Sequence, residues 1–177
     1  RGSTNTRQTF RAAIGLDGTL SNGFDWDLYY SYGFSDRMQY SGAYNAANMA
    51  YAVNAITGPT GQPICADPVA QARNCVPINL FGIDAASQEA VDYVKAQTSR
   101  QSKNKQRTAA FNITGDFNLL GLDASFAAGV ERREERGMDV PDPLQLAGLH
   151  GGNKVPLTVG EYSVNGYYGE LLVPLVQ

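Results

Sequence analysis

The residues that could support catalysis are few and scattered along the sequence. The densest charged run is Glu131–Arg136, and the only histidine, His150, lies in the Gly-rich stretch 148–154. The glycine spacing around His150 does not match a phosphate-binding loop, and no Ser or Thr follows Lys154. No Ser-His-Asp set and no pair of carboxylates in a predicted cleft stands out. We therefore expect no enzyme activity, no metal site and no cofactor.

Cys65 and Cys75 are the only cysteines, and nine residues separate them in a Pro- and Gly-rich region. Two cysteines without a nearby histidine make a poor zinc site. We therefore predict a disulfide that closes this small loop, with two free thiols as the alternative. A disulfide at this place would indicate an oxidising compartment.

The elements that position these residues are predicted by an alternation with a period of two. It is clearest over 24–34, where even positions are apolar or aromatic and odd positions are mostly polar, and it continues to about Tyr44. The last strand loses clear alternation around 164–168, which suggests a bulge. The same alternation predicts four further strands: 8–20, 104–119, 122–136 and about Thr158 to Val176.

The alternation separates two sets of side chains. For the apolar set we predict contact with lipid: Phe24, Trp26, Leu28, Tyr30, Phe111, Ile113, Phe117 and Phe126. The polar set would face the interior of a barrel: Arg11, Asp17, Asp25, Asp27, Tyr29, Asn112, Asp116, Asp123 and Glu131. These polar residues either form a polar wall around a water-filled or plugged interior, or contact a substrate or a plug. The sequence leaves both interpretations open.

The connections between the predicted strands alternate between short and long. Ser21-Asn22-Gly23 is a strong hairpin signal, and a hairpin symmetric about Asn22 places Leu20 opposite Phe24 and Gly18 opposite Trp26. Leu120-Gly121 is the second short connection. Two long connections, 45–103 and 137–156, complete the pattern. Since consecutive strands are antiparallel, the short turns should lie at one end of the strands and the long connections at the other.

The long connection 45–103 is predicted to contain two short helices. Ala46 to Ile56 is rich in alanine, and Ser87 is a good N-cap for a helix through Gln97. Val91 and Val94 should mark the buried side of the second helix.

An antiparallel transmembrane β-barrel accounts for these patterns together. The apolar side of 24–34 covers eleven residues, and a tilted strand needs about 9–11 residues to cross a bilayer. Short turns on one side and long loops on the other are typical of outer-membrane barrels. About five strands cannot close, since such barrels need at least about eight. We therefore expect a segment of a larger barrel.

Five cationic residues share the parity of the apolar side chains but lie beyond them on their strands. Mirror pairing about the Leu120-Gly121 turn places Arg107 opposite Glu134 and Lys105 near Arg136, as an exposed network of charges. We hypothesise that the cations contact the phosphates of lipopolysaccharide: Lys103, Lys105, Arg107, Arg132 and Arg136. The net charge of −3 does not favour a nucleic-acid partner.

Several segments together resemble the barrel of TonB-dependent outer-membrane receptors. They are Phe24–Gly33, Cys75–Gly82, Ala127–Glu134, and Gly160–Val164 leading to Gly169–Leu175, and the similarity covers nearly all of the chain. The resemblance implies a barrel of about 22 strands with an N-terminal plug domain. It also implies import of a scarce ligand, such as a siderophore, vitamin, saccharide or peptide, with energy relayed from the inner membrane. No plug and no energy-coupling box is recognisable in this sequence.

The sequence therefore predicts part of an active importer in the bacterial outer membrane. Its binding surface would lie in the connections 45–103 and 137–156. The expected partners are outer-membrane lipid and lipopolysaccharide, the plug and remaining strands of the same protein, the TonB system through regions outside this sequence, and a small-molecule substrate. The chain begins at Arg1 without a Met or a targeting segment, which we interpret as an internal or trimmed piece. The alternatives are a passive porin and a soluble β-sandwich for binding or adhesion.

Overall fold

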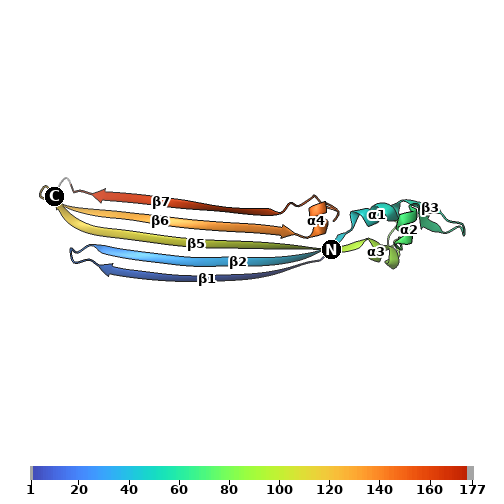
Figure 1. The fold of residues 1–177 in the computed structure, drawn as a ribbon, viewed down its shortest axis with the longest axis horizontal. Helices are drawn as coiled ribbons and strands as arrows, with labels where there is room; N and C mark the ends of the chain where they lie inside the picture. Colours follow the sequence, from blue (N-terminus) through green and yellow to red (C-terminus); the bar gives the residue numbers. More distant parts are fainter. Residues whose placement is uncertain (1, 175–177) are drawn as a thin grey trace. The chain divides into compact units, whose positions relative to one another are not determined.

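The computed structural model describes residues 2–174 and is built mainly of β-strands. Five long strands form one open antiparallel sheet in the order β1-β2-β5-β6-β7, so β1 and β7 are its edges (Figure 1). The strands are β1 (Ser3–Thr19), β2 (Asp25–Tyr44), β5 (Lys95–Leu119), β6 (Leu122–Pro141) and β7 (Thr158–Leu172). Within the described residues, no helix has the length and apolar character needed to cross a membrane.

The two long connections contain short elements. The first connection includes α1 (Ala46–Val53), β3 (Ala55–Thr57), β4 (Pro63–Cys65), α2 (Pro68–Ala72) and α3 (Gln88–Val94). β3 and β4 pair as a small antiparallel sheet. The second connection includes α4 (Pro143–Ala147).

The chain divides into two compact units. The first, which we call the loop unit, contains Met38–Gln101 and Asp139–Leu157, and it holds the four helices of the described residues and the β3-β4 sheet. The second, which we call the strand unit, contains Arg7–Arg37, Ser102–Met138 and the strand β7. Its described residues form only segments of the five-stranded sheet and the two short turns.

The predicted hairpin between β1 and β2 is confirmed with its register. The Gly23 N–H donates to the Leu20 carbonyl at 2.9 Å, and Gly23 has a φ of 83°, which glycine adopts without strain. Further along, Phe10 and Phe34 stack with 5.8 Å between ring centroids, as symmetry about Asn22 requires. The Trp26 ring covers Gly18, where an added Cβ would lie 3.1 Å from the indole nitrogen.

The predicted pairing of β5 and β6 about the second turn is also confirmed. Leu120 and Gly121 both have positive φ, at 54° and 87°, which suits a two-residue hairpin turn. Away from the turn, the Ser125 hydroxyl donates to Asp116 at 2.6 Å. This pair has the register that a turn centred on 120–121 imposes.

The strands are longer than the alternation of apolar residues indicates. β1 begins at Ser3 instead of residue 8, and β5 begins at Lys95 instead of residue 104. β6 continues to Pro141, so the long connections shrink to 45–94 and 142–157. The segments added to β1 and β5 have mostly polar side chains on both faces, and without an apolar face they give no period-two signal.

The predicted helix after Ser87 forms but ends early. The Ser87 hydroxyl caps α3 by accepting from the Ala90 N–H at 3.2 Å. Lys95 has an extended backbone, so the helix ends at Val94 and not at Gln97. Val94 is buried as predicted, but Val91 is 37% exposed and Ala90 takes its place in the core. The first helix forms as α1, with Asn45 as its N-cap.

The predicted bulge in β7 is wrong. Arg136 contacts Glu161 at 2.9 Å and Arg132 donates to Asn165 at 3.4 Å, and the Tyr168 ring next to Gly129 follows the same register. The alternation looked irregular because Tyr168 lies on the polar face of the sheet. β7 ends at Leu172, and the predicted end at Val176 lies outside the described residues.

We expect Gly115→Ala to destabilise the sheet, because an added Cβ would lie 2.3 Å from the Phe24 ring. Overpacking of this kind typically costs about 1–3 kcal/mol. The matched control is Gly169→Ala, since nothing lies within 4 Å of the Cβ position at Gly169. Thermal unfolding followed by circular dichroism should show a lower midpoint for the first variant only. Equal midpoints would contradict the packing of Phe24 on Gly115.

Candidate functional site

The polar face of the strand unit brings the predicted polar residues to one side of the sheet. Side-chain hydrogen bonds between neighbouring strands link several of them, which confirms that they share a face. The Arg11 guanidinium donates to the Tyr29 hydroxyl at 3.0 Å, and the Thr19 hydroxyl donates to Asp25 at 2.7 Å. The predicted residues on this face are Arg11, Asp17, Asp25, Asp27, Tyr29, Asn112, Asp116, Asp123 and Glu131.

A chain of hydrogen bonds crosses the middle of this face. The Asn112 amide donates to Asp27 at 2.8 Å, and the Tyr168 hydroxyl donates to the Asn112 carbonyl oxygen at 3.1 Å. The link runs from β2 through β5 to β7 and passes over β6 at Gly129. There, an added Cβ would lie 2.3 Å from the Tyr168 ring. A glycine at position 129 is therefore what allows Tyr168 to reach Asn112.

These residues form a polar wall and not a convergent pocket. Asp116 accepts from Ser125 at 2.6 Å, and Asp123 accepts from the Asn118 amide at 3.4 Å, each across one strand pair. Each pair joins one donor to one carboxylate on the neighbouring strand, and the β1-β2 register also places Asp17 opposite Asp27. Within the described residues, no group of three or more His, Cys, Asp or Glu side chains is placed to hold a metal.

A second polar cluster lies further from the short turns. Glu135 accepts hydrogen bonds from Tyr162 and from the Gln106 amide, the latter at 3.1 Å. These hydrogen bonds lower the pKa of the Glu135 carboxyl below its ordinary value, with Tyr162 as the larger cause. The cluster joins β5, β6 and β7. Sequence reasoning missed Tyr162 and Tyr168, because the irregular alternation of the last strand hid which face they occupy.

The apolar face of the strand unit carries aromatic rings near both ends of its apolar segment. Close to the short turns, the Phe126 ring packs edge to face against two other rings. Its centroid lies 4.9 Å from that of Phe24 and 6.0 Å from that of Phe117. At the other end, Phe34 stacks with Phe10 and lies 6.4 Å from Tyr32. The residues predicted to contact lipid all lie on this face: Phe24, Trp26, Leu28, Tyr30, Phe111, Ile113, Phe117 and Phe126.

The apolar face is not covered by another layer of the strand unit. The described residues of this unit form a single sheet, so its apolar side chains have no second sheet or helix to pack against. Ile14 and Leu16 on this face remain 66% and 58% exposed. A contiguous exposed apolar surface of this kind marks contact with a membrane or with another protein surface.

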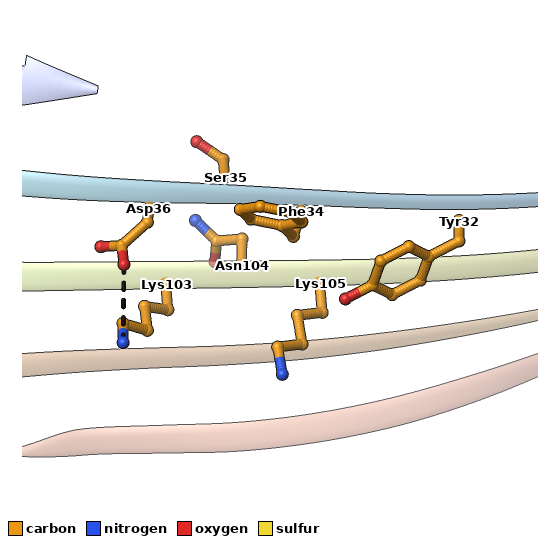
Figure 2. A pocket seen from close by; sticks show the side chains of 7 residues that line it. All are labelled: Tyr32, Phe34, Ser35, Asp36, Lys103, Asn104 and Lys105. Carbon is orange, nitrogen blue, oxygen red and sulfur yellow. Dashed lines mark ion pairs between the residues drawn. The ribbon is translucent and has the colours of Figure 1, made fainter. Parts of the chain in front are cut away.

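A small hollow lies where the apolar face gives way to charged residues. Its volume is about 270 Å³, and Figure 2 shows the side chains that line it from β2 and β5. Lys103 forms an ion pair with Asp36 at 3.5 Å. The lining residues are Tyr32, Phe34, Ser35, Asp36, Lys103, Asn104 and Lys105.

The predicted charge network around this hollow has the expected register but other partners. Glu134 pairs with Arg132 of its own strand at 2.9 Å. Arg107 instead lies over the Tyr32 ring, 6.0 Å from its centroid. Arg136 pairs with Glu161 of β7 at 2.9 Å. The cations therefore contact an aromatic ring and neighbouring carboxylates in place of a single alternating ladder.

The loop unit has a small core closed by the predicted disulfide. Cys65 and Cys75 are bonded, with 6.2 Å between their Cα atoms. Cys65 is buried together with Ala52, Ala70 and Ala90. The two long connections also meet within this unit, since the Ala46 N–H donates to the Leu149 carbonyl at 2.8 Å. The connections predicted to form a binding surface therefore belong to one compact body.

Two features of the loop unit are unusual: a pair of exposed apolar side chains and a buried histidine nitrogen without a partner in the described part of the chain. Phe81 and Ile83 are 89% and 96% exposed, which is unusual for large apolar side chains. His150 is half-buried, and its Nδ1 atom has no hydrogen-bond partner in the structure. The structure places no acidic or sulfur ligand set around His150 among the described residues.

Comparison of the sequence with models of known protein families and with curated proteins finds no match.

We expect Asn112→Asp to destabilise the sheet. The Asn112 amide donates to the Asp27 carboxylate at 2.8 Å, and the substitution replaces this donor with a carboxylate that repels Asp27. Like charges directly opposite on a sheet cost up to about 1 kcal/mol. The matched control combines Asn112→Asp with Asp27→Asn, which restores a donor and an acceptor in exchanged positions. Chemical denaturation should show recovery in the double variant. A double variant as unstable as the single one would contradict the pairing.

Replacing both Cys65 and Cys75 by serine should loosen the loop unit without unfolding the sheet. A disulfide that closes a loop of this size stabilises the folded state by roughly 2–3 kcal/mol. Limited proteolysis should cut the variant within 45–94 at protease concentrations that leave the parent chain intact. Control cleavage at Gly121, which belongs to the strand unit, should not change. Equal protease resistance of both proteins would show that the disulfide does not stabilise this unit.

Proposed function

We propose that this chain is part of a transmembrane β-barrel in the bacterial outer membrane, and that the barrel belongs to an active importer of the TonB-dependent receptor type. The observation that carries the proposal is the contrast between the two faces of one sheet. One face is apolar, aromatic at both ends and uncovered, and the other is polar and hydrogen-bonded. Lipid on one side and a water-filled or plugged interior on the other would account for both faces.

The height of the apolar face supports a bilayer as the covering medium. Phe24, directly before β2, and Phe34 on β2 mark its two ends, ten residues apart. At about 3.3 Å per residue this is roughly 33 Å along the strand, and a tilt of about 40° leaves roughly 25 Å. This equals the height of the apolar band of outer-membrane barrels, about 25 Å, which is flanked by aromatic residues on both sides.

The open edges of the sheet support a larger barrel. β1 and β7 are edge strands of 17 and 15 residues, and each has neighbours on one side only. Unpaired backbone groups cost several kcal/mol each in hydrocarbon, so strands span membranes only as closed barrels. The remaining strands of the same protein would pair with these two edges.

Import of a scarce ligand is supported by the sequence segments that resemble TonB-dependent receptors and by the loop unit. In such a receptor the loop unit would present the ligand-binding surface, and the polar face would contact the plug domain. The ligand would be a siderophore, vitamin, saccharide or peptide. Energy would come from the TonB system through regions of the protein outside this sequence.

The membrane assignment is tested by two adjacent substitutions in β5. Ile113→Arg places a charge on the apolar face near the middle of the proposed membrane segment, and Thr114→Arg places it on the polar face. Ile113→Arg should destabilise the folded barrel by about 2–4 kcal/mol and Thr114→Arg by little, because only the first substitution exposes arginine to hydrocarbon. The measurement is the amount of folded full-length protein recovered from outer membranes.

Two results would contradict the proposal. One is equal recovery of the two arginine variants, and the other is a parent protein that stays in solution without detergent after cell lysis. Proteoliposomes carrying the full-length protein separate an importer from a passive porin. An importer closed by its plug should not swell in a sugar solution, whereas a porin should.

A further inference from the structure

The border of the apolar face gathers charges of mostly one sign. Around the Tyr32 and Phe34 end of the apolar face, β2, β5, β6 and β7 carry five cationic side chains and three carboxylates on the same face. The carboxylates are Asp36, Glu134 and Glu161. The cations are Lys103, Lys105, Arg107, Arg132 and Arg136.

Three of these cations already have an acidic partner. Lys103 pairs with Asp36 at 3.5 Å, Arg132 with Glu134 at 2.9 Å, and Arg136 with Glu161 at 2.9 Å. Exposed ion pairs of this kind leave little net charge for an outside anion. Lys105 and Arg107 are therefore the two cations whose charge remains available.

Lys105 is exposed and makes no ion pair or side-chain hydrogen bond within the described residues. It lines the 270 Å³ hollow beside the Tyr32 and Phe34 rings, as Figure 2 shows. Arg107 lies two residues further along β5 on the same face, with its guanidinium 6.0 Å from the centre of the Tyr32 ring. This cation–π contact lies beside the hollow, and within the described residues Arg107 makes no ion pair and no side-chain hydrogen bond, so its N–H donors are available to an anion.

We propose that Lys105 and Arg107, together with the Tyr32 ring, bind the phosphate of an anionic lipid headgroup at the edge of the membrane. This inference rests on the proposed function, because it needs lipid against the apolar face. The phosphates of lipopolysaccharide fit, since they lie at the level where acyl chains end and the cations of this face begin. Lysine and arginine near a membrane surface attract anionic lipid in this way, and aromatic rings lie at the same depth.

The position of the two cations favours a lipid over free phosphate. Both lie at the end of an apolar face, where a headgroup phosphate would be held by its own acyl chains. Phe34, opposite Lys105 on β2, offers an apolar surface to those chains. A free phosphate would gain nothing from the rings and would remain exposed to water.

The test uses the full-length protein that carries this sequence, purified in mild detergent, and lipid A in detergent micelles as the probe. Each cation lost near an anionic lipid surface should weaken binding about fivefold, so Lys105→Gln combined with Arg107→Gln should weaken it about 25-fold. The matched control, Arg7→Gln with Arg133→Gln, removes the same charge from the polar face and should bind like the parent. Circular dichroism confirms that both variants fold.

Three results would overturn the inference: unchanged binding by the Lys105 and Arg107 variant, an equal loss in the control, or displacement of lipid A by submillimolar inorganic phosphate. The last result would assign the site to free phosphate. Failure of the proposed function is distinguishable, because the parent protein would then be recovered in solution without detergent. A protein that requires detergent but ignores these substitutions contradicts the lipid site alone.

Discussion

Backbone pairing between neighbouring strands, held in one register, is the constraint on which both faces of this sheet depend. Successive side chains of a strand point to opposite faces, so a slip of one residue would exchange the apolar and polar sets. Trp26 would then lie among the polar residues and Asp27 among the aromatic rings. The hydrogen bond from Asn112 to Asp27, at 2.8 Å, would be lost in the same step. Correct pairing and the separation of the faces are therefore one requirement.

Glycines opposite aromatic rings fix this register along the sheet. Trp26 covers Gly18, Phe24 lies on Gly115, and Tyr168 lies on Gly129. At Gly115 and Gly129 an added Cβ would lie 2.3 Å from the ring, so a shifted register that placed a larger residue there would clash. The two-residue turn at Leu120-Gly121 adds a local constraint. Rings over glycines then extend the register to strand pairs that no short turn joins.

Local signals allowed much of this arrangement to be predicted from the sequence. The Asn22-Gly23 turn determines the register of β1 and β2, and the alternation in 24–34 assigns their faces. The Ser87 cap and the pair of cysteines are likewise signals within a few residues. The pairing of β2 with β5 joins strands separated by the connection 45–94, so no local pattern specifies which residues meet.

Other features were hidden because the sequence pattern reports burial and not pairing. The polar ends of β1 and β5 form ladders without an apolar face, and so they lacked a period-two signal. Tyr168 is an aromatic residue on the polar face, where it reaches Asn112 over Gly129. Arg107 lies opposite Glu134 as the β5-β6 turn predicts, but its contact with the Tyr32 ring depends on the β2-β5 register. Each of these features depends on which residues pair between strands, and the alternation within one strand does not report this pairing.

The most direct measurement of the central claim uses Trp26, the only tryptophan of this sequence. The full-length protein is reconstituted with phospholipids brominated on their acyl chains, and the fluorescence lost on Trp26→Phe is taken as the signal of this residue. Contact with hydrocarbon predicts strong quenching by the brominated lipid and little quenching by aqueous iodide. Quenching by iodide with no effect of the brominated lipid would contradict the account, because Trp26 would then face water or protein.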